Sequence, residues 1–184
     1  VNETIVTSWS EAGHHTYLWN TTALSDGVYV LKLKAYDQAG NIAETSCSVT
    51  VDNTLPVANI HYPSDGSYVR GTVLVEVSGE DLNFDEMEFR VGDFVHVWKE
   101  SGSQIFVWET LDFDDGVYML VLSVRDKAGN MAETSIQATV DNTAPSLSNL
   151  TWNPSEPLAG EQVNVSVKVL EVGSGIKNVT LWYK

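Results

Sequence analysis

The sequence lacks several features that define common classes of protein. It has a single cysteine, Cys47, which excludes an intrachain disulfide and a zinc site built from several cysteines. No apolar run approaches the roughly 20 residues that span a bilayer, so we expect no membrane insertion within this segment. No signal-peptide pattern is present, and the chain opens on Val1 rather than Met. We therefore expect it to be a segment of a longer protein.

Basic residues are also scarce. The chain has 10 Lys and Arg against 25 Asp and Glu, which gives a formal net charge of −15. No Lys/Arg-rich run offers a footprint for phosphates, so binding to nucleic acid or to an anionic membrane is not expected. Phosphate-binding glycine loops, Gly-x-Ser-x-Gly elbows and His-Glu-x-x-His motifs are missing too. We expect no catalytic activity.

What the sequence does contain is a long internal repeat. The stretch AYDQAGNIAETSCSVTVDNTLP, residues 35–56, returns as VRDKAGNMAETSIQATVDNTAP at residues 124–145, 89 positions later. Residues 1–56 and 90–145 are identical at 26 of 56 aligned positions, without a gap. Agreement at this level indicates duplication, and repeats of this period indicate an array of similar domains.

Each copy has the alternating pattern of β-strands. In residues 27–37 one set of alternate residues is apolar, and the matching residues of the second copy, Tyr118, Leu120, Leu122 and Val124, keep that property while the opposite set varies. A strand with one fixed and one free face is typical of a half-buried sheet. In the next strand Cys47 aligns with Ile136 of the second copy, so we interpret Cys47 as a buried hydrophobic residue.

Turn signals divide one full repeat into seven short strands. They fall at residues 57–62, 72–79, 86–91, 93–99, 104–110, 116–126 and 131–141. No window shows a sustained period of 3.6 residues. The fold class predicted is all-β: tandem immunoglobulin-like β-sandwiches of about 89 residues per repeat with little or no helix.

The phrase DGVYVLKLKAYDQAGNIAETSCSVTVDNTLP resembles the tandem Ig-like, fibronectin-III-like repeats of bacterial and archaeal surface proteins and secreted enzymes. The shared motifs are Asp-Gly-x-Tyr, Asp-x-Ala-Gly-Asn and Val-Asp-x-Thr-x-Pro. In addition, Tyr29 and Tyr118 resemble the tyrosine corner of such sandwiches, in which the phenol bonds back to the preceding turn. The resemblance implies the fold and leaves the function open.

The repeat pattern divides the chain into three parts. Residues 1–56 match the C-terminal part of one Ig-like repeat, residues 57–145 form a complete one, and residues 146–184 match the N-terminal part of a third, with Val163, Val165, Val167 and Val169 facing inward. The partial copies together amount to almost one repeat. Two alternatives follow: the chain is cut from a longer array, or the partial domains of different copies complement each other head to tail.

Acidic and amide residues recur in the hairpin turn and at the exit of each copy. Such oxygen-rich segments suit calcium and resemble the acidic linkers of calcium-rigidified adhesins, so we predict that calcium can bind although no cofactor is required. The alternative is that these residues have a conformational role only, because Asp and Asn stabilise turns. The candidate ligands are Asp37, Asn41, Asp52, Asn53, Asp126, Asn130, Asp141 and Asn142. The loop DLNFDE departs from an EF-hand at Glu86 and Gly92, and we interpret it as solvated.

Two further kinds of surface site are candidates. Asn-x-Ser/Thr sequons, which accept N-glycans, occur at Asn2, Asn20, Asn149, Asn164 and Asn178. Tryptophans can line a sugar-binding platform, but Trp9 and Trp19 recur as Trp98 and Trp108, which favours packing. Trp152 and Trp182 remain candidates for glycan contact.

These observations predict a structural or spacer module of an extracellular or cell-surface protein from a bacterium or archaeon: a stalk, adhesin or filament segment. Its expected partners are neighbouring Ig-like domains of the same or an identical chain. The alternative is an accessory module of a secreted hydrolase that binds carbohydrate or polymer.

Overall fold

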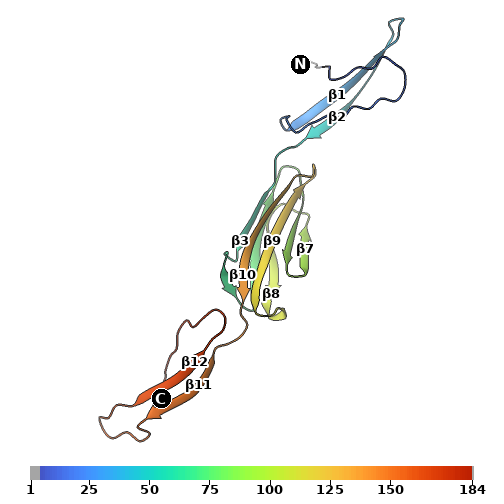
Figure 1. Cartoon of the computed structure of the whole chain (residues 1–184). Coiled ribbons are helices and arrows are strands. Elements are labelled where there is room, and N and C mark those ends of the chain that lie inside the picture. Colours follow the sequence, from blue (N-terminus) through green and yellow to red (C-terminus); the bar gives the residue numbers. More distant parts are fainter. Residues whose placement is uncertain (1–4, 184) are drawn as a thin grey trace. The chain divides into compact units, whose positions relative to one another are not determined.

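The computed structural model describes residues 5–183. The chain divides into two compact units, Val1–Thr54 and Leu55–Lys184, and each is described by itself. Twelve strands and one short 3-10 helix make up the described secondary structure (Figure 1). The all-β prediction is therefore confirmed.

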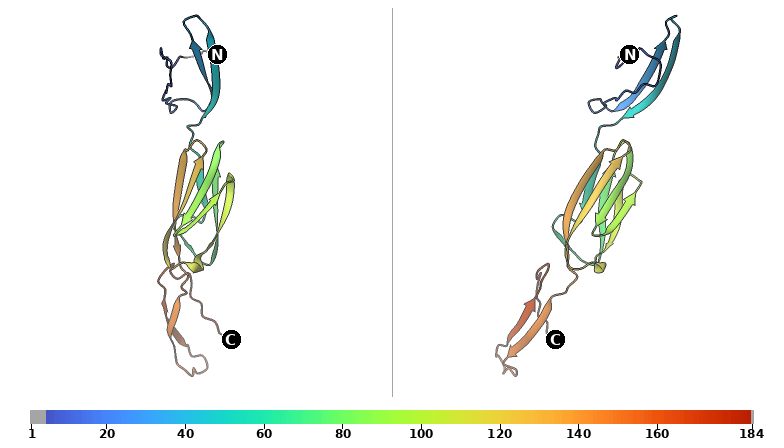
Figure 2. Two further views of the ribbon diagram at one scale, coloured as in Figure 1. Left: turned by 90° about the vertical axis from the view of Figure 1, so that its right-hand side faces the viewer. Right: turned by 45° about the vertical axis from the view of Figure 1, so that its right-hand side comes forward.

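The middle repeat, residues 57–145, contains two sheets, in which every strand pair but one is antiparallel. The first contains β3 (Val57–Tyr62), β5 (Thr72–Glu80) and β8 (Gly102–Glu109) in the order β3-β5-β8. The second has the order β4-β10-β9-β6-β7. Figure 2 shows the ribbon of the chain in two further views. Its strands are β4 (Ser67–Val69), β6 (Phe84–Val91), β7 (Phe94–Trp98), β9 (Gly116–Asp126) and β10 (Met131–Val140).

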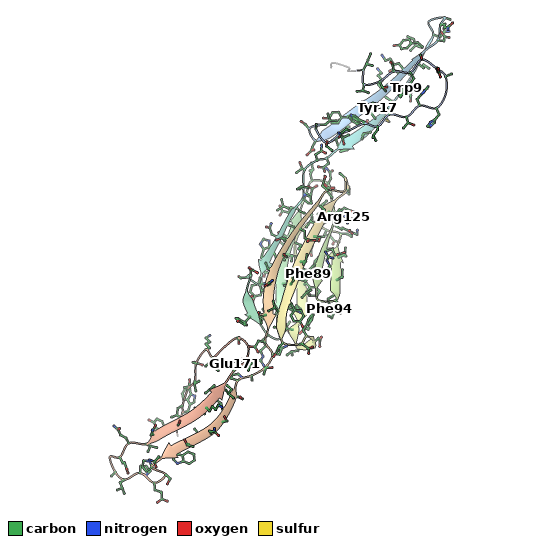
Figure 3. The ribbon with its side chains drawn as sticks, in the orientation of Figure 1. Trp9, Tyr17, Phe89, Phe94, Arg125 and Glu171 are labelled. Atoms are coloured by element: carbon green, nitrogen blue, oxygen red, sulfur yellow. The ribbon has the colours of Figure 1, made fainter. Side chains whose placement is uncertain are left out.

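Alternation along the strands builds the core between these sheets. Leu120, Leu122 and Val124 of β9 are fully buried, as are Val75 and Val77 of β5, whereas the residues between them face outward. Because successive side chains point to opposite faces of a strand, one apolar face per strand is enough to fill the interior. Phe89 of β6 completes this core from the five-stranded sheet (Figure 3).

The strand predictions for the middle repeat are confirmed. All seven predicted strands occur, and residues 116–126 match β9 in full. Sequence reasoning missed β4, a three-residue strand that pairs in parallel with β10, and the 3-10 helix η1 (Thr110–Asp112). Both are too short to generate a period.

The first unit contains one hairpin, β1 (Gly27–Tyr36) and β2 (Ile42–Val51). Its register runs from Gly27↔Val51 to Tyr36↔Ile42. This pairing is the one that joins β9 to β10, from Gly116↔Val140 to Arg125↔Met131. The duplicated sequence therefore produces a duplicated ladder.

The third repeat contains β11 (Ser146–Asn153) and β12 (Asn164–Leu170). These two strands pair antiparallel, with Ser146 opposite Leu170 and a register shift between Ser148 and Thr151. In the middle repeat β3 pairs with β5 in the same way, with Val57 opposite Glu80 and a shift between Ile60 and Tyr62. The third repeat thus contains the counterpart of the β3-β5 pair.

Segments whose ladder partners are missing do not form strands. Residues 13–20 match β8, which pairs only with β5, and residues 5–9 match β7, which pairs only with β6. No strand is assigned at either segment, nor at residues 176–183, which match β6. The same kind of sequence forms a strand in the middle repeat because its neighbour is there to accept the hydrogen bonds.

One prediction is wrong. Cys47, expected to be buried, is exposed, and most of β2 around it is exposed as well. The inward alternation is correct, because the matching Ile136 packs against the core of the middle repeat. Burial fails because no second sheet covers the β1-β2 hairpin among the described residues of its unit.

The two copies allow a matched test of this account. Leu122 of β9 is fully buried, whereas its counterpart Leu33 is 54% exposed. We expect Leu122→Ala to lower the free energy of unfolding by about 2–5 kcal/mol, because it leaves a cavity. Leu33→Ala should change it by less than about 0.5 kcal/mol, as is usual for exposed sites. Urea denaturation in dilute solution measures both, and equal effects would contradict the assignment of the core.

Candidate functional site: the clamped exit of each repeat

The two motifs that recur in the sequence, Asp-Gly-Val-Tyr and Val-Asp-Asn-Thr, bind one another. In the middle repeat the Asp115 carboxylate lies just before β9, and Asn142 and Thr143 lie just after β10. The Asn142 backbone N–H donates to Asp115 Oδ1 at 2.7 Å, and the Thr143 hydroxyl donates to Oδ2 at 2.5 Å. A single carboxylate therefore holds two successive residues of the exit segment.

The Asn142 side chain closes the arrangement from the other direction. Its Nδ2 donates to the backbone carbonyl of Thr110 at 2.8 Å and to that of Phe113 at 3.4 Å. The Thr110 hydroxyl donates to Asn142 Oδ1 at 3.2 Å. We call this set, Asp115, Asn142, Thr143 and the carbonyls of residues 110 and 113, the exit clamp. It ties the departing chain to the turn that precedes β9.

The first copy has the same clamp. The Asn53 backbone N–H donates to Asp26 Oδ1 at 2.6 Å, and the Thr54 hydroxyl donates to the other oxygen of Asp26. Asn53 Nδ2 donates to the carbonyls of Thr21 and Leu24, each at 3.0 Å. The clamp therefore forms even where the rest of the sandwich is missing, because all its members lie within residues 21–54.

The tyrosine of the first motif supports the turn beneath the clamp. Tyr118 Oη donates to the carbonyl of Asp114 at 3.0 Å, and Tyr29 Oη donates to that of Ser25 at 2.8 Å. The expected tyrosine corner is confirmed in both copies. The Tyr118 ring also packs edge-on against Trp108 and Phe113, so the turn that receives the exit segment rests on the aromatic part of the core.

The clamp bonds change the acidity of its carboxyl groups. The hydrogen bond from the Thr143 side chain, followed by that from the Asn142 backbone, lowers the pKa of Asp115 below its ordinary value. The pKa of Asp26 is lowered in the same way by Thr54 and Asn53. Hydrogen bonds donated to a carboxylate favour its charged form, so the clamp is strongest when both aspartates are ionised.

The hairpin turns use a separate pair of predicted residues. Asp37 accepts from the Asn41 backbone N–H at 2.8 Å and from Asn41 Nδ2 at 2.6 Å. Asp126 accepts from the same two groups of Asn130 at 2.9 and 2.7 Å. The pKa of Asp37 is lowered, first by the Asn41 side chain and then by its backbone. The glycine inside each turn has positive φ, which explains why glycine recurs there.

The structure therefore sorts the eight predicted calcium ligands into two kinds of place. Within one repeat, the turn pair lies at the closed end of the hairpin and the exit pair at its open end, ten residue pairs apart. No single ion can be shared by the turn pair and the exit pair of one hairpin. Calcium binding to these residues stays a prediction.

Two acidic residues outside the predicted set of calcium ligands, Asp81 and Glu171, are partly buried. The carboxylate oxygens of Asp81 and the buried Asp126 approach within 4.8 Å of each other. Glu171, at the end of β12 (Figure 3), buries both carboxylate oxygens without a hydrogen-bond partner among the described residues. Asp81 begins the loop DLNFDE, which we interpreted from the sequence as solvated, and no sequence signal identified Glu171.

Asp141 makes the contact between the middle repeat and the turn after β12. Its Oδ2 accepts from the Ser174 backbone N–H at 2.6 Å, and its backbone N–H donates to the carbonyl of Val69 at 3.1 Å. The bonds from Ser174, first its side chain and then its backbone, lower the pKa of Asp141. A Cβ atom on Gly173 would lie 2.5 Å from Asp141 Oδ2, so a residue larger than glycine does not fit there without a shift.

The glycosylation candidates lie on the surface where the structure describes them. Asn20, Asn149, Asn164 and Asn178 are all exposed, and Asn2 lies outside the described residues. Asn20 Oδ1 accepts from both the backbone N–H and the hydroxyl of Thr22, the third residue of its sequon, at 3.0 and 2.8 Å. Modification of these residues stays a prediction.

The comparisons with known proteins agree with this architecture. Two family models, both described as a bacterial Ig-like domain, match residues 1–53 and 111–142. These two segments contain most of the two exit clamps: the first match ends one residue before Thr54, and the second leaves out Thr110 and Thr143. The chain is built of Ig-like repeats, and such repeats serve as structural or accessory modules.

Similar solved structures include an endo-β-1,4-mannanase from Thermotoga petrophila, with 24% identity and a TM-score of 0.45. The match covers 50% of this chain and 21% of that one. Fibronectin(III)-like modules of CbhA from Clostridium thermocellum match at 17% identity and a TM-score of 0.41, over 64% of each chain. The chain thus spans less than two thirds of either structure, and at these TM-scores neither likeness bears on function. No curated protein matches. Among the described residues no helix is long and apolar enough to cross a membrane.

The lowered pKa of Asp115 gives the clamp a pH dependence. Because its folded pKa lies below the ordinary value of 3.8, the clamp stabilises the fold above pH 3.8, and this stabilisation is lost as the pH falls through the folded pKa. We expect Asp115→Asn to reduce the loss of stability on acidification below about pH 4. Asp114→Asn, which removes the adjacent charge but no clamp bond, is the control. Melting temperatures between pH 2 and 6 measure both. Identical profiles for wild type and Asp115→Asn would contradict this role.

Proposed function

We propose that this chain is a spacer segment of an extracellular or cell-surface protein, a stalk, adhesin or filament module that holds other parts at a distance. The observation that carries this proposal is the duplicated exit clamp. A spacer must control the direction in which the chain leaves each domain, and the clamp fixes two successive residues at that point. The proposal includes no catalytic role for the chain itself.

The contact at Asp141 supports the same role. It lies one residue before the clamped Asn142, so the chain is held on one side by the middle repeat and on the other by the turn at Ser174. The four linker residues 142–145 end on Pro145, which lacks an N–H group and has a fixed φ. Hydrogen bonds and a proline both limit the freedom of a linker, which suits a module that transmits position or force.

Composition agrees with an exposed location. A net charge of −15 keeps neighbouring molecules soluble and apart, and exposed sequons would carry glycans outside the cell. The partners in this proposal are neighbouring Ig-like domains, of the same chain or an identical one. Calcium at the turn or exit carboxylates would stiffen the array further, but the clamp uses protein donors alone.

The test removes the Asn142 side-chain bonds of the clamp while keeping the fold. Asn142→Ala deletes the Nδ2 donor to residues 110 and 113, so we expect faster backbone motion at residues 141–146. Nuclear magnetic relaxation of labelled protein measures it, as a fall of the order parameter from about 0.85 toward 0.6. Asn59→Ala, an exposed amide of β3, is the control. Unchanged order in Asn142→Ala would contradict a spacer built on the clamp.

A second candidate function has one observation in its favour. Trp152 is 56% exposed and pairs with Val165 in the β11-β12 ladder. An exposed aromatic ring can stack on a sugar, which supports an accessory module that binds carbohydrate or polymer.

A glycan array separates this candidate from the spacer. If the module binds sugar through Trp152, Trp152→Ala should lose at least about tenfold in affinity, equivalent to about 1.4 kcal/mol. Trp182→Ala, at the other exposed tryptophan, tests whether one ring or both make contact. No binding by the wild-type chain to any glycan would leave the spacer as the function.

A further inference from the structure

The turn after β12, residues 171–175, contacts the end of the middle repeat so closely that no side chain fits between them. We infer that this turn, the junction loop, docks onto the preceding repeat and that Gly173 determines which repeat can follow there. The surface is the end of the middle repeat at Asp141, and the partner it fits is a loop that offers a backbone N–H group and no Cβ atom. The inference rests on the proposed spacer function for its meaning and deepens it, because it names the residues that fix one repeat against the next.

The docking surface is built around the Asp141 carboxylate. The backbone N–H of Asp141 donates to the carbonyl of Val69 at 3.1 Å, one residue beyond the β4-β10 pairing, which ends at Val140. The next residue, Asn142, belongs to the exit clamp. The backbone of Asp141 is therefore held on both sides by bonds within the complete repeat. Its partner loop lies in the same compact unit, Leu55–Lys184.

The junction loop donates one hydrogen bond to this carboxylate. The backbone N–H of Ser174 lies 2.6 Å from Asp141 Oδ2. A hydrogen bond to an ionised acceptor is stronger than one between two neutral groups. Ser174 lies outside the β11-β12 ladder, so its N–H has no strand partner there. Breaking the contact would leave both the N–H and the carboxylate to water.

The glycine beside Ser174 is explained by space. A Cβ atom on Gly173 would lie 2.5 Å from Asp141 Oδ2 and 2.6 Å from Asp141 Cγ, which is far inside the separation that non-bonded atoms keep. The φ of Gly173 is not positive, so a left-handed backbone conformation does not account for the glycine. A side chain at position 173 would therefore displace the carboxylate that holds Ser174.

The rest of the contact is loosely packed. A cavity of about 380 Å³ lies beside it, lined by the clamp residues Asp115 and Thr143 and by Val172 and Gly173 of the junction loop. The side chain of Val172 is 96% exposed and adds little apolar contact. The hydrogen bond to Asp141 therefore carries the docking, and its loss should release the loop.

The corresponding loop of the middle repeat has different chemistry. Residues 81–83 follow β5 as residues 171–173 follow β12, which places Asn83 at the position of Gly173. The Asn83 backbone N–H donates to Asp81 Oδ1 at 2.6 Å, so this loop satisfies its own donor. It also has a side chain where the junction loop has none. The two loops are therefore not interchangeable, and the end of the middle repeat selects a following repeat of the second kind.

Amide hydrogen exchange of the 184-residue chain tests the docking, in EDTA so that calcium does not contribute. The Ser174 amide of the wild type should exchange at least about tenfold more slowly than in an unstructured peptide. Gly173→Ala should abolish this protection, because its Cβ atom displaces the carboxylate. Val172→Ala, in the same loop at a side chain that is 96% exposed, is the matched control and should preserve it. An unprotected Ser174 amide in the wild type overturns the inference, as does an equal effect of the two substitutions.

A double-mutant cycle separates docking from a general disturbance of the loop. Asp141→Ala removes the acceptor and should also deprotect the Ser174 amide. The three atoms nearest to a Cβ on Gly173 all belong to the Asp141 side chain, so without that carboxylate the Cβ no longer meets the group it would displace. Gly173→Ala should then add less than about a twofold change to the exchange rate of Asp141→Ala. Additive effects would mean that position 173 acts through its own backbone, and they would overturn the inference.

The outcomes are separable from those of the spacer test. Order at residues 141–146 in Asn142→Ala reports on the exit clamp, whereas exchange at Ser174 reports on the junction loop. Loss of order in Asn142→Ala together with an unprotected Ser174 amide overturns this inference and leaves the spacer function in place. A protected Ser174 amide together with unchanged order in Asn142→Ala supports the docking and removes the clamp on which the spacer proposal rests.

Discussion

The structure depends on one constraint: a strand of this fold persists only where a neighbour accepts its hydrogen bonds. β1 and β2 pair with each other, and so do β11 and β12, and these four strands are formed in the partial repeats. The counterparts of β7 and β8 have no neighbouring strand among the described residues of their unit and remain irregular. Unpaired backbone groups can be solvated, but they then lose the order that the ladder gives. Residues 13–20 and β8 are identical at only two of eight positions, so local sequence contributes to the difference together with topology.

Burial follows the ladders. Leu122 and Leu33 occupy equivalent positions, yet Leu122 is fully buried and Leu33 is half exposed. Among the described residues only the hairpin of Leu122 has a second sheet packed against it. Small all-β domains store most of their stability in such cross-sheet contacts. A repeat therefore either is complete or leaves apolar faces that another set of strands must cover. Charge on the middle repeat discourages random association without covering those faces.

Much of this could be predicted from the sequence, and the limits have physical causes. Comparison of the two copies identified the inward face of β9 and the span of every long strand, because packing preserves the apolar residues on one face. Burial of Cys47 was predicted wrongly, since period alone does not say whether a second sheet is present. The clamp was also missed: Asp115 and Asn142 recur in both motifs, but they are 27 residues apart, and only the fold brings them within 2.7 Å.

The clamp and the core have different requirements, and this difference suits an array. Every member of the first clamp lies within residues 21–54, so it forms in a half repeat as it does in a full one. The core instead needs strands from both halves of the repeat. Exit direction is thus set locally, before or without completion of the sandwich, while cohesion requires the distant half. A protein built this way can fix the geometry of each junction independently of where the covering strands come from, whether from its own chain or from a second copy.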